Sequence, residues 1–241
     1  MKYEFDSRIR YSEVDSESKL TWPALMDYFQ DCSVFQSEML HMGVDYLAKN
    51  HQAWVLTSWQ ICLNRMPKLA DKVTTQTWAY GMKGFYGYRN FVMNDESKNR
   101  LAYANSIWAL MDIQSGRPVK VPEEMIKRYG LEPQLPMECD GRKIALPKEW
   151  EAKDTFVVPA YFMDTNHHMN NRHYVEVALG YVPEHFTIGQ IRVEYCKAAL
   201  SGDSMIPKVS IADHKIVVAL ADTTDKPYAI VEFQEAISMR R

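Results

Sequence analysis

One short stretch of the chain gathers polar side chains of the kinds that take part in catalysis. It reads Asp164-Thr-Asn166-His-His168-Met-Asn170-Asn171, so an aspartate, an asparagine and a histidine occupy alternate positions. Asn170 is a favourable N-cap, which predicts that a helix begins directly after the cluster. The amide groups at a helix N-terminus favour negative charge that develops beside them during a reaction. We therefore take Asp164, Asn166 and His168 as candidate catalytic residues.

Two other interpretations of this cluster stay open. In the first, the side chains are structural: Asp164 and Asn166 form Asx-turns, the next asparagine only caps the helix, and the histidines face solvent. In the second, a metal ion is bound by Asp164 together with His167, His168 and His173. The metal site is disfavoured because adjacent histidines point in different directions and no second pair of ligands occurs elsewhere.

The elements that must position this cluster follow a pattern that begins in the first half of the chain. Thr21 can cap a helix with Pro23 in its first turn, and helical spacing continues to about Leu40. Runs of β-branched and aromatic residues follow, separated by turn residues, and predict an antiparallel sheet. These predicted strands are 54–63, 72–80, 86–93 and 100–112, and a short helix is expected near 123–129.

The second half repeats this order and part of its spacing. An offset of 149 residues carries Asp15 to Asp164 and Thr21 to Asn170. The strands that follow are related by an offset of 132 residues, with 59–71 laid on 191–203 and further strands at 205–212, 215–221 and 228–237. Matching caps and matching element order indicate an internal duplication.

The duplication predicts two α+β domains, each an antiparallel sheet wrapped around a central helix. We expect the N-terminal domain at residues 1–130 and the C-terminal domain at 150–241, joined by a polar, proline-bearing linker at 131–149. The halves differ at the polar cluster, because the first half reads Asp15-Ser-Glu-Ser-Lys-Leu-Thr. This asymmetry favours the second half as the site of chemistry.

Composition excludes several classes of protein. The 241 residues include 28 basic and 31 acidic side chains, and the net charge of −3 with a pI near 6.2 argues against a nucleic-acid binder. The charged N-terminus lacks the apolar core of a secretory signal, and the longest apolar runs, such as 216–221, fall far short of the ~18 residues of a membrane span. Four scattered cysteines without a CxxC pair are typical of reduced thiols, so we expect a cytoplasmic protein.

The polar cluster also resembles a known signature. Asp164-x-Asn166-x-His168-x-Asn170-Asn171-x-x-Tyr174 is similar to the motif of the acyl-acyl carrier protein thioesterases, plant plastid and bacterial enzymes with a tandem, or double, hotdog fold. The resemblance extends through the first half, to segments 84–92, 104–112 and 117–124. It implies that the N-terminal hotdog holds the acyl chain and the C-terminal hotdog carries the catalytic residues.

The reaction implied by this resemblance is hydrolysis of the thioester of fatty acyl-acyl carrier protein. Water attacks the thioester carbonyl, and free fatty acid and carrier-protein thiol are released, which ends chain elongation. The resemblance implies that Asn166 and His168 position and polarise the carbonyl or the water, and that Asp164 orients them. We add that helix-terminal amides near Asn170 could stabilise the oxyanion. The implied partner is acyl carrier protein bearing a fatty acyl-phosphopantetheine, and no cofactor is implied.

The chain departs from the family pattern at the general base. The family uses a glutamate on the strand after the helix, followed by a cysteine, and these positions fall here on Ala198 and Ala199. Because side chains alternate along a strand, Glu194 and Cys196 share a face with Ala198 and are candidate replacements, although ~6–7 Å separates successive residues on one face. Asp164 acting through water is the other candidate base.

Substrate contacts are predicted only in outline. Trp54, Trp59, Met82 and Trp108 are candidates to line a tunnel for the acyl chain, although an ordinary core is the favoured explanation of any one of them. An acidic carrier protein would need basic residues, which are available at Arg65, Lys68, Lys72, Lys83, Arg117, Lys120, Lys127 and Arg128. An acyl-CoA thioesterase and a noncatalytic lipid-binding hotdog protein stay open as alternatives, as does a homodimer.

Overall fold

The computed structural model describes residues 1–236, which divide into two compact units. The first unit comprises Met1–Thr57 and Leu63–Asp140, and the second comprises Ser58–Cys62 and the chain from Gly141 onward. The division falls inside the segment expected to be a linker, and one strand contributes to both units. Within residues 1–236, no helix combines the length and apolar character needed to cross a membrane.

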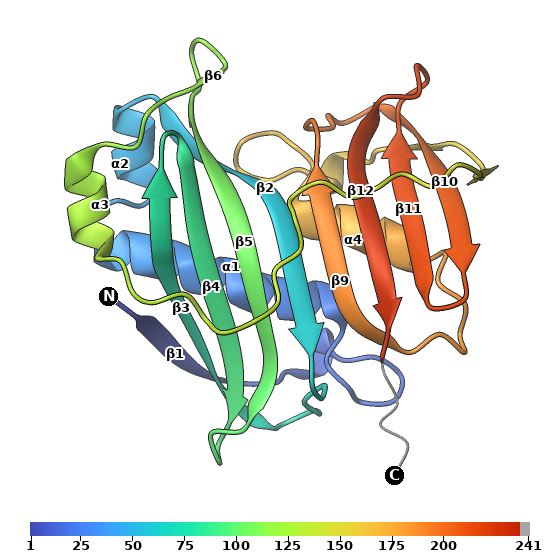
Figure 1. The fold of residues 1–241 in the computed structure, drawn as a ribbon, viewed down its shortest axis with the longest axis horizontal. Helices are drawn as coiled ribbons and strands as arrows, with labels where there is room; N and C mark the ends of the chain where they lie inside the picture. Colours follow the sequence, from blue (N-terminus) through green and yellow to red (C-terminus); the bar gives the residue numbers. More distant parts are fainter. Residues whose placement is uncertain (237–241) are drawn as a thin grey trace. The chain divides into compact units, whose positions relative to one another are not determined.

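The first unit is an antiparallel sheet with a long helix against it (Figure 1). Its strands occur in the order β1-β3-β4-β5, and β2 is adjacent to β5. The elements in chain order are β1 (Tyr3–Arg8), a 3₁₀ turn (Tyr11–Glu13), α1 (Trp22–Met39), α2 (Val44–Lys49), β2 (Gln52–Leu63), β3 (Lys72–Lys83), β4 (Tyr86–Asp95), β5 (Arg100–Asp112), β6 (Arg117–Pro118) and α3 (Glu123–Tyr129).

Helix α1 begins where the sequence predicts. The Thr21 side chain accepts a hydrogen bond from the Ala24 amide at 3.3 Å, and proline lies in the first turn. Leu25, Phe29 and Cys32 follow at helical spacing and are fully buried. The ring of Phe29 lies 5.4 Å from that of Phe91 on β4, so this face of the helix packs directly on the sheet.

The second unit has the same order of elements in a shorter form. It contains β7 (Glu151–Ala152), β8 (Phe156–Val157), a 3₁₀ turn (Ala160–Phe162), α4 (Asn171–Leu179), β9 (Ile188–Tyr195), β10 (Ser204–Ala212), β11 (Lys215–Ala221) and β12 (Pro227–Glu235). Residues 58–62 of β2 pair with β9, and the sheet continues as β12-β11-β10-β7. The predicted strand 228–237 is found at Pro227–Glu235, and Ile237 lies outside the described residues.

The segment expected to be a linker is held against both units. In the first unit, the Trp78 indole donates to the Pro133 carbonyl at 2.9 Å, and the Leu135 amide donates to Asn90 Oδ1 at 2.9 Å. In the second unit, Arg192 Nη2 donates to the Gly141 carbonyl at 2.6 Å. Ile144 packs there with Val217, Ala219, Ile230 and Trp150. The segment therefore covers one face of the second sheet, while α4 packs against the other.

Candidate active site

The polar cluster forms a tight loop directly before α4. The Asp164 amide donates to the His168 carbonyl at 2.7 Å, and the His167 amide donates to the Asp164 carbonyl at 3.0 Å. Met163 and Met169 form a β-bridge at the base of the loop, and His167 takes a φ of 60°, in the left-handed region. The loop backbone is therefore defined by its own hydrogen bonds.

The Asp164 side chain also helps to hold the loop in this conformation. Its Oδ1 accepts hydrogen bonds from the Asn166 amide at 2.7 Å and the His168 amide at 3.2 Å. A carboxylate that accepts two backbone N–H groups fixes the residues that carry them. Asp164 thus orients the backbone of both Asn166 and His168.

The first unit contains the same loop around Asp15. Asp15 Oδ1 accepts from the Glu17 amide at 2.9 Å and the Lys19 amide at 3.0 Å, and the Asp15 amide donates to the Lys19 carbonyl at 2.8 Å. Ser18 has a φ of 60°, and Val14 and Leu20 form the matching bridge. The aspartate and the loop geometry are therefore common to both units and do not by themselves mark a catalytic site.

Two of the side chains that differ between the loops, Asn166 and His168, are of kinds that take part in catalysis. Asn166 and His168 stand where the first loop has Glu17 and Lys19, which form an ion pair with each other at 2.6 Å. Asn166 and His168 are exposed, and neither side chain has a hydrogen-bond partner among residues 1–236. An amide and an imidazole are thus free to contact a substrate on a loop whose backbone is fixed.

The N-terminus of α4 lies next in the chain. Asn170 Oδ1 accepts from the Arg172 amide at 3.1 Å, which confirms the predicted cap. The first amides of this nine-residue helix supply a region of positive potential beside the loop. Among the described residues, no group of three or more histidine, cysteine, aspartate or glutamate side chains is placed to hold a metal ion. His173 instead stacks on Phe162 and contacts Glu176.

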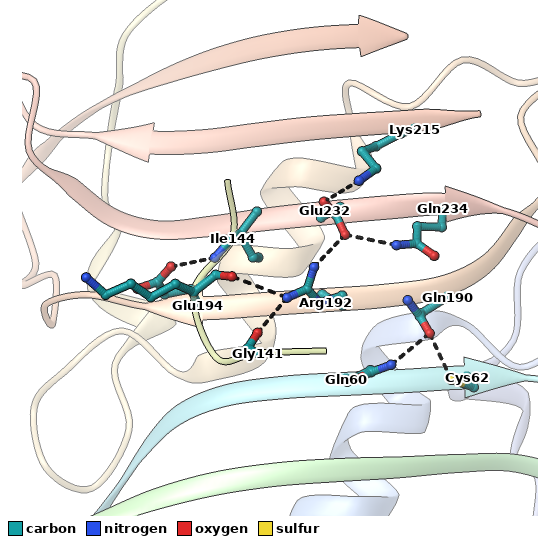
Figure 2. A network of polar contacts seen from close by, with 11 residues as sticks. Gln60, Cys62, Gly141, Ile144, Gln190, Arg192, Glu194, Lys215, Glu232 and Gln234 are labelled. Atoms are coloured by element: carbon teal, nitrogen blue, oxygen red, sulfur yellow. Dashed lines mark hydrogen bonds and ion pairs between the residues drawn. The ribbon is translucent and has the colours of Figure 1, made fainter. Parts of the chain in front are cut away.

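Glu194 is not brought to this loop. Tyr195, its neighbour on β9, directs its hydroxyl to the Asn171 carbonyl of α4, so Glu194 belongs to the opposite face of the strand. There its carboxylate accepts from the Ile144 amide at 2.9 Å (Figure 2). It also lies 4.0 Å from Arg142 Nη1. Only 8% of Glu194 is exposed. The structure thus gives this side chain a role in holding the segment that follows Gly141.

Glu194 and Ala198 do not lie on one face of a strand as expected, because β9 ends at Tyr195. Ala198 is exposed in the irregular segment that follows, and Ala199 is fully buried. The Ala199 carbonyl accepts from the Met169 amide at 2.9 Å, which places this segment against the base of the loop. The position that carries a glutamate in the family pattern therefore adjoins the loop, but here it has no ionisable side chain.

A buried polar network on the Glu194 face was not anticipated from the sequence. Glu232 on β12 is 2% exposed and contacts Arg192 at 2.9 Å and Lys215 at 3.0 Å (Figure 2). Burial acts to raise the pKa of Glu232, but hydrogen bonds from Lys215, Arg192 and Gln234 outweigh it and hold the pKa below its ordinary value. Arg192 also donates to the Gly141 carbonyl, so the network links three strands, β9, β11 and β12, to the covering segment.

Three of the four candidate tunnel residues gather around Gly87. Met82 on β3 and Trp108 on β5 are its direct partners across the sheet, so all three positions share one face. A Cβ atom at Gly87 would lie 3.1 Å from the Trp54 ring, so glycine permits this close approach. Trp54 and Met82 also pack against a core that includes Met42, Leu110 and Met125. Trp59 lies elsewhere, on the part of β2 that pairs with β9 in the second unit.

The eight basic candidates fall into two groups. Arg65, Lys72 and Arg128 form ion pairs with carboxylates of the first unit. Among the described residues, the side chains of the other five form no ion pair with a carboxylate: Lys68, Lys83, Arg117, Lys120 and Lys127. Lys83 and Lys120 flank the hydrogen bond from the Val121 amide to the Gly84 carbonyl, 2.9 Å long. These two exposed ammonium groups lie at one end of the first sheet.

Comparison with known proteins identifies relatives along most of the chain. A chloroplastic acyl-acyl-carrier-protein hydrolase of Cuphea viscosissima is 25% identical over 245 aligned residues, which cover 90% of this chain and 58% of that protein. A chloroplastic palmitoyl-acyl carrier protein thioesterase of Gossypium hirsutum is 24% identical over 205 residues, covering 78% and 49%. The chain thus spans about half the length of the curated relatives it matches.

Solved structures show the same fold. A crystal structure of an acyl-ACP thioesterase from Bacteroides thetaiotaomicron superposes with a TM-score of 0.88 at 20% identity, covering 98% of each chain. The 12:0-ACP thioesterase from Umbellularia californica gives a TM-score of 0.86 at 16% identity, covering 98% of this chain and 97% of that one. These superpositions confirm the predicted tandem hotdog fold.

Family models settle the classification. The acyl-ACP thioesterase N-terminal domain matches residues 1–129, and the acyl-ACP thioesterase C-terminal domain matches residues 147–230. Together with the two matching loops and the shared order of strands, these matches show that the chain belongs to the acyl-ACP thioesterase family.

Proposed function

We propose that this chain hydrolyses the thioester that joins a fatty acyl group to acyl carrier protein. The products are free fatty acid and the carrier thiol, so the reaction ends chain elongation. The observation that carries the proposal is the difference between two matching loops. Asn166 and His168 are free where Glu17 and Lys19 are paired with each other. Family membership and the names of the relatives support the substrate class.

In the proposed reaction, water adds to the thioester carbonyl carbon. The Asn166 side-chain amide donates a hydrogen bond to the carbonyl oxygen, and the first amides of α4 stabilise the negative charge that forms there. The His168 imidazole accepts the proton of the attacking water and returns it to the sulfur when the carbon–sulfur bond breaks. Asp164 holds the loop that carries both groups.

This assignment makes His168 the general base. Imidazole is the side chain best suited to accept and release a proton near neutral pH. Glu194 is left out of the proposal because its carboxylate is buried on the opposite face of β9 and bound to the Ile144 amide. A covalent route is also left out, because the cysteine position implied by the family pattern is the buried Ala199.

The first unit is proposed to hold the acyl chain. Trp54, Met82 and Trp108 supply a large apolar surface around Gly87, where the absence of a side chain lets the Trp54 ring lie close to the strand. Lys83 and Lys120 are proposed to attract the acidic carrier protein. We propose a cytoplasmic location, supported by four cysteines that are all free thiols.

The proposal is tested by supplying the same acyl chain on two carriers. Purified protein is incubated with acyl-ACP of graded chain length and, separately, with the matching acyl-CoA, and both thiol and free acid are measured. We expect hydrolysis of both acyl-ACP and acyl-CoA, with a kcat/KM at least about ten-fold higher for acyl-ACP. A preference for acyl-CoA would favour the coenzyme A alternative. Binding of acyl-ACP without release of acid would favour the noncatalytic one.

A further inference from the structure

The backbone beneath the candidate loop is arranged in the same way in the two units, except for one amide. In the first unit, the Leu20 amide donates to the Pro67 carbonyl at 2.9 Å, and in the second the Met169 amide donates to the Ala199 carbonyl at 2.9 Å. Proline has no N–H, whereas alanine has one. Because Ala199 is completely buried, its N–H needs a partner inside the protein.

Tyr174 supplies that partner. Its hydroxyl oxygen accepts a hydrogen bond from the Ala199 amide at 2.9 Å, and the residue is only 2% exposed. At the equivalent position of the first unit stands Leu25, which is fully buried and has no polar group. The equivalent positions therefore hold leucine and proline in the first unit, and tyrosine and alanine in the second.

The hydroxyl connects α4 to the segment that supports the loop. The Tyr174 ring also packs edge-on against Tyr195, with centroids 5.7 Å apart, and the Tyr195 hydroxyl donates to the Asn171 carbonyl at 3.0 Å. Both tyrosines thus fasten the first two turns of α4 to β9 and to the residues that follow it. Burial raises the pKa of Tyr174 to about 12, so its hydroxyl stays neutral across the working range of pH.

We propose that Tyr174 is a positioning residue for the thioesterase reaction, acting through Ala199 and Met169 on the loop that carries Asn166 and His168. This inference rests on the proposed function. The chain of contacts is continuous: the Tyr174 hydroxyl holds the Ala199 amide, and the Ala199 carbonyl holds the Met169 amide at the base of the loop. Loss of the hydroxyl leaves a buried N–H without a partner, which favours movement of this segment.

The test compares Tyr174→Phe with the double variant Tyr174→Phe/Ala199→Pro. Phenylalanine keeps the ring and removes only the acceptor, so we expect kcat to fall at least about ten-fold, while KM changes less than about two-fold. Proline at position 199 removes the unsatisfied N–H and reproduces the arrangement at Pro67. We therefore expect the double variant to recover kcat to within about three-fold of the original protein. Tyr80→Phe is the matched control, because the Tyr80 hydroxyl donates to Asn105 in the first unit at 2.7 Å and does not contact the loop.

Amide hydrogen exchange tests the same contact without requiring activity. In Tyr174→Phe, we expect exchange at Ala199 and Met169 to accelerate at least about ten-fold, with no such change in Tyr80→Phe. If the original protein is inactive, the proposed function fails, while exchange still decides the role of Tyr174. Full activity with unchanged exchange in Tyr174→Phe would overturn the inference. A double variant that folds and is as slow as the single one would also overturn it, because the loss of activity would then not come from the unpaired Ala199 N–H.

Discussion

Replacement of Asp164 by asparagine separates loop closure from proton transfer. Asparagine retains an oxygen at the Oδ1 position, which can still accept from the amides of Asn166 and His168, now at 2.7 and 3.2 Å. It loses the negative charge, and charge-assisted hydrogen bonds are about twice as strong as neutral ones. Net values of about 1.5–3 kcal/mol for charged and about 0.5–1.5 kcal/mol for neutral hydrogen bonds give a difference of about 2–3 kcal/mol for the two bonds. Solvent screening at this half-buried site reduces that difference by about half or more, so the loop loses about 1 kcal/mol.

If Asp164 only positions the loop, Asp164→Asn should lose less activity than if Asp164 is the general base. A loss of about 1 kcal/mol from a positioning contact reduces kcat by less than about ten-fold. Loss of a general base costs roughly 10²–10⁴-fold. The assay is steady-state hydrolysis of acyl-ACP, accompanied by thermal unfolding of the same samples. We expect Asp164→Asn to lower Tm by about 2–4 °C and kcat by less than about ten-fold.

Asp15→Asn is the matched control, because it makes the same change in the loop of the first unit. It should lower Tm by a similar amount and leave kcat unchanged. A fall in kcat of about 100-fold or more for Asp164→Asn with no change in Tm would refute the reasoning, since the carboxylate would then take part in the reaction itself.

Three further predictions follow from individual contacts. Lys83→Glu combined with Lys120→Glu should reduce kcat/KM for acyl-ACP several-fold at low ionic strength, and salt should diminish this difference; an effect independent of salt would count against electrostatic docking. The pKa of Glu232 is depressed, so its stabilising contribution is present above its ordinary value of 4.5 and is lost as the pH falls through the folded-state pKa. Glu232→Gln should therefore lower the free energy of unfolding measured in urea at pH 7 more than at pH 3, and an equal loss at both would contradict this. Gly87→Ala places a Cβ atom 3.1 Å from the Trp54 ring and should displace that ring. We expect the variant to prefer shorter acyl chains when acyl-ACP substrates of graded length are compared. An unchanged preference would show that the residues around Gly87 do not bind the acyl chain.

Local sequence signals predicted the repeated elements because each depends on neighbouring residues. The caps at Thr21 and Asn170 and the offset between Asp15 and Asp164 are visible in the sequence, and both loops have the expected positions. The edge strand Tyr3–Arg8 was not predicted, because only Tyr3 and Phe5 are apolar in it, although they alternate regularly with exposed charged residues.

Contacts between distant residues could not be predicted in the same way. Alternation along β9 cannot show which face of the strand meets α4 and which meets the covering segment. Glu194 was therefore expected near the loop, whereas its carboxylate lies on the opposite face, against the Ile144 amide. The pairing of Arg192 with Glu232 depends on β9 and β12 being adjacent, although 40 residues separate them in sequence. Similarly, the role of the Asp164 carboxylate in loop closure became clear only when its hydrogen bonds matched those of Asp15.

The central claim is that the second loop is catalytic because it carries His168 and Asn166 on a backbone that the first loop shares. The most direct measurement compares acyl-ACP hydrolysis by His168→Ala with that by Lys19→Ala, the same change at the equivalent position of the first loop. We predict that His168→Ala lowers kcat at least about 100-fold with little change in Tm, and that Lys19→Ala retains full activity. Full thioesterase activity in His168→Ala would contradict the account.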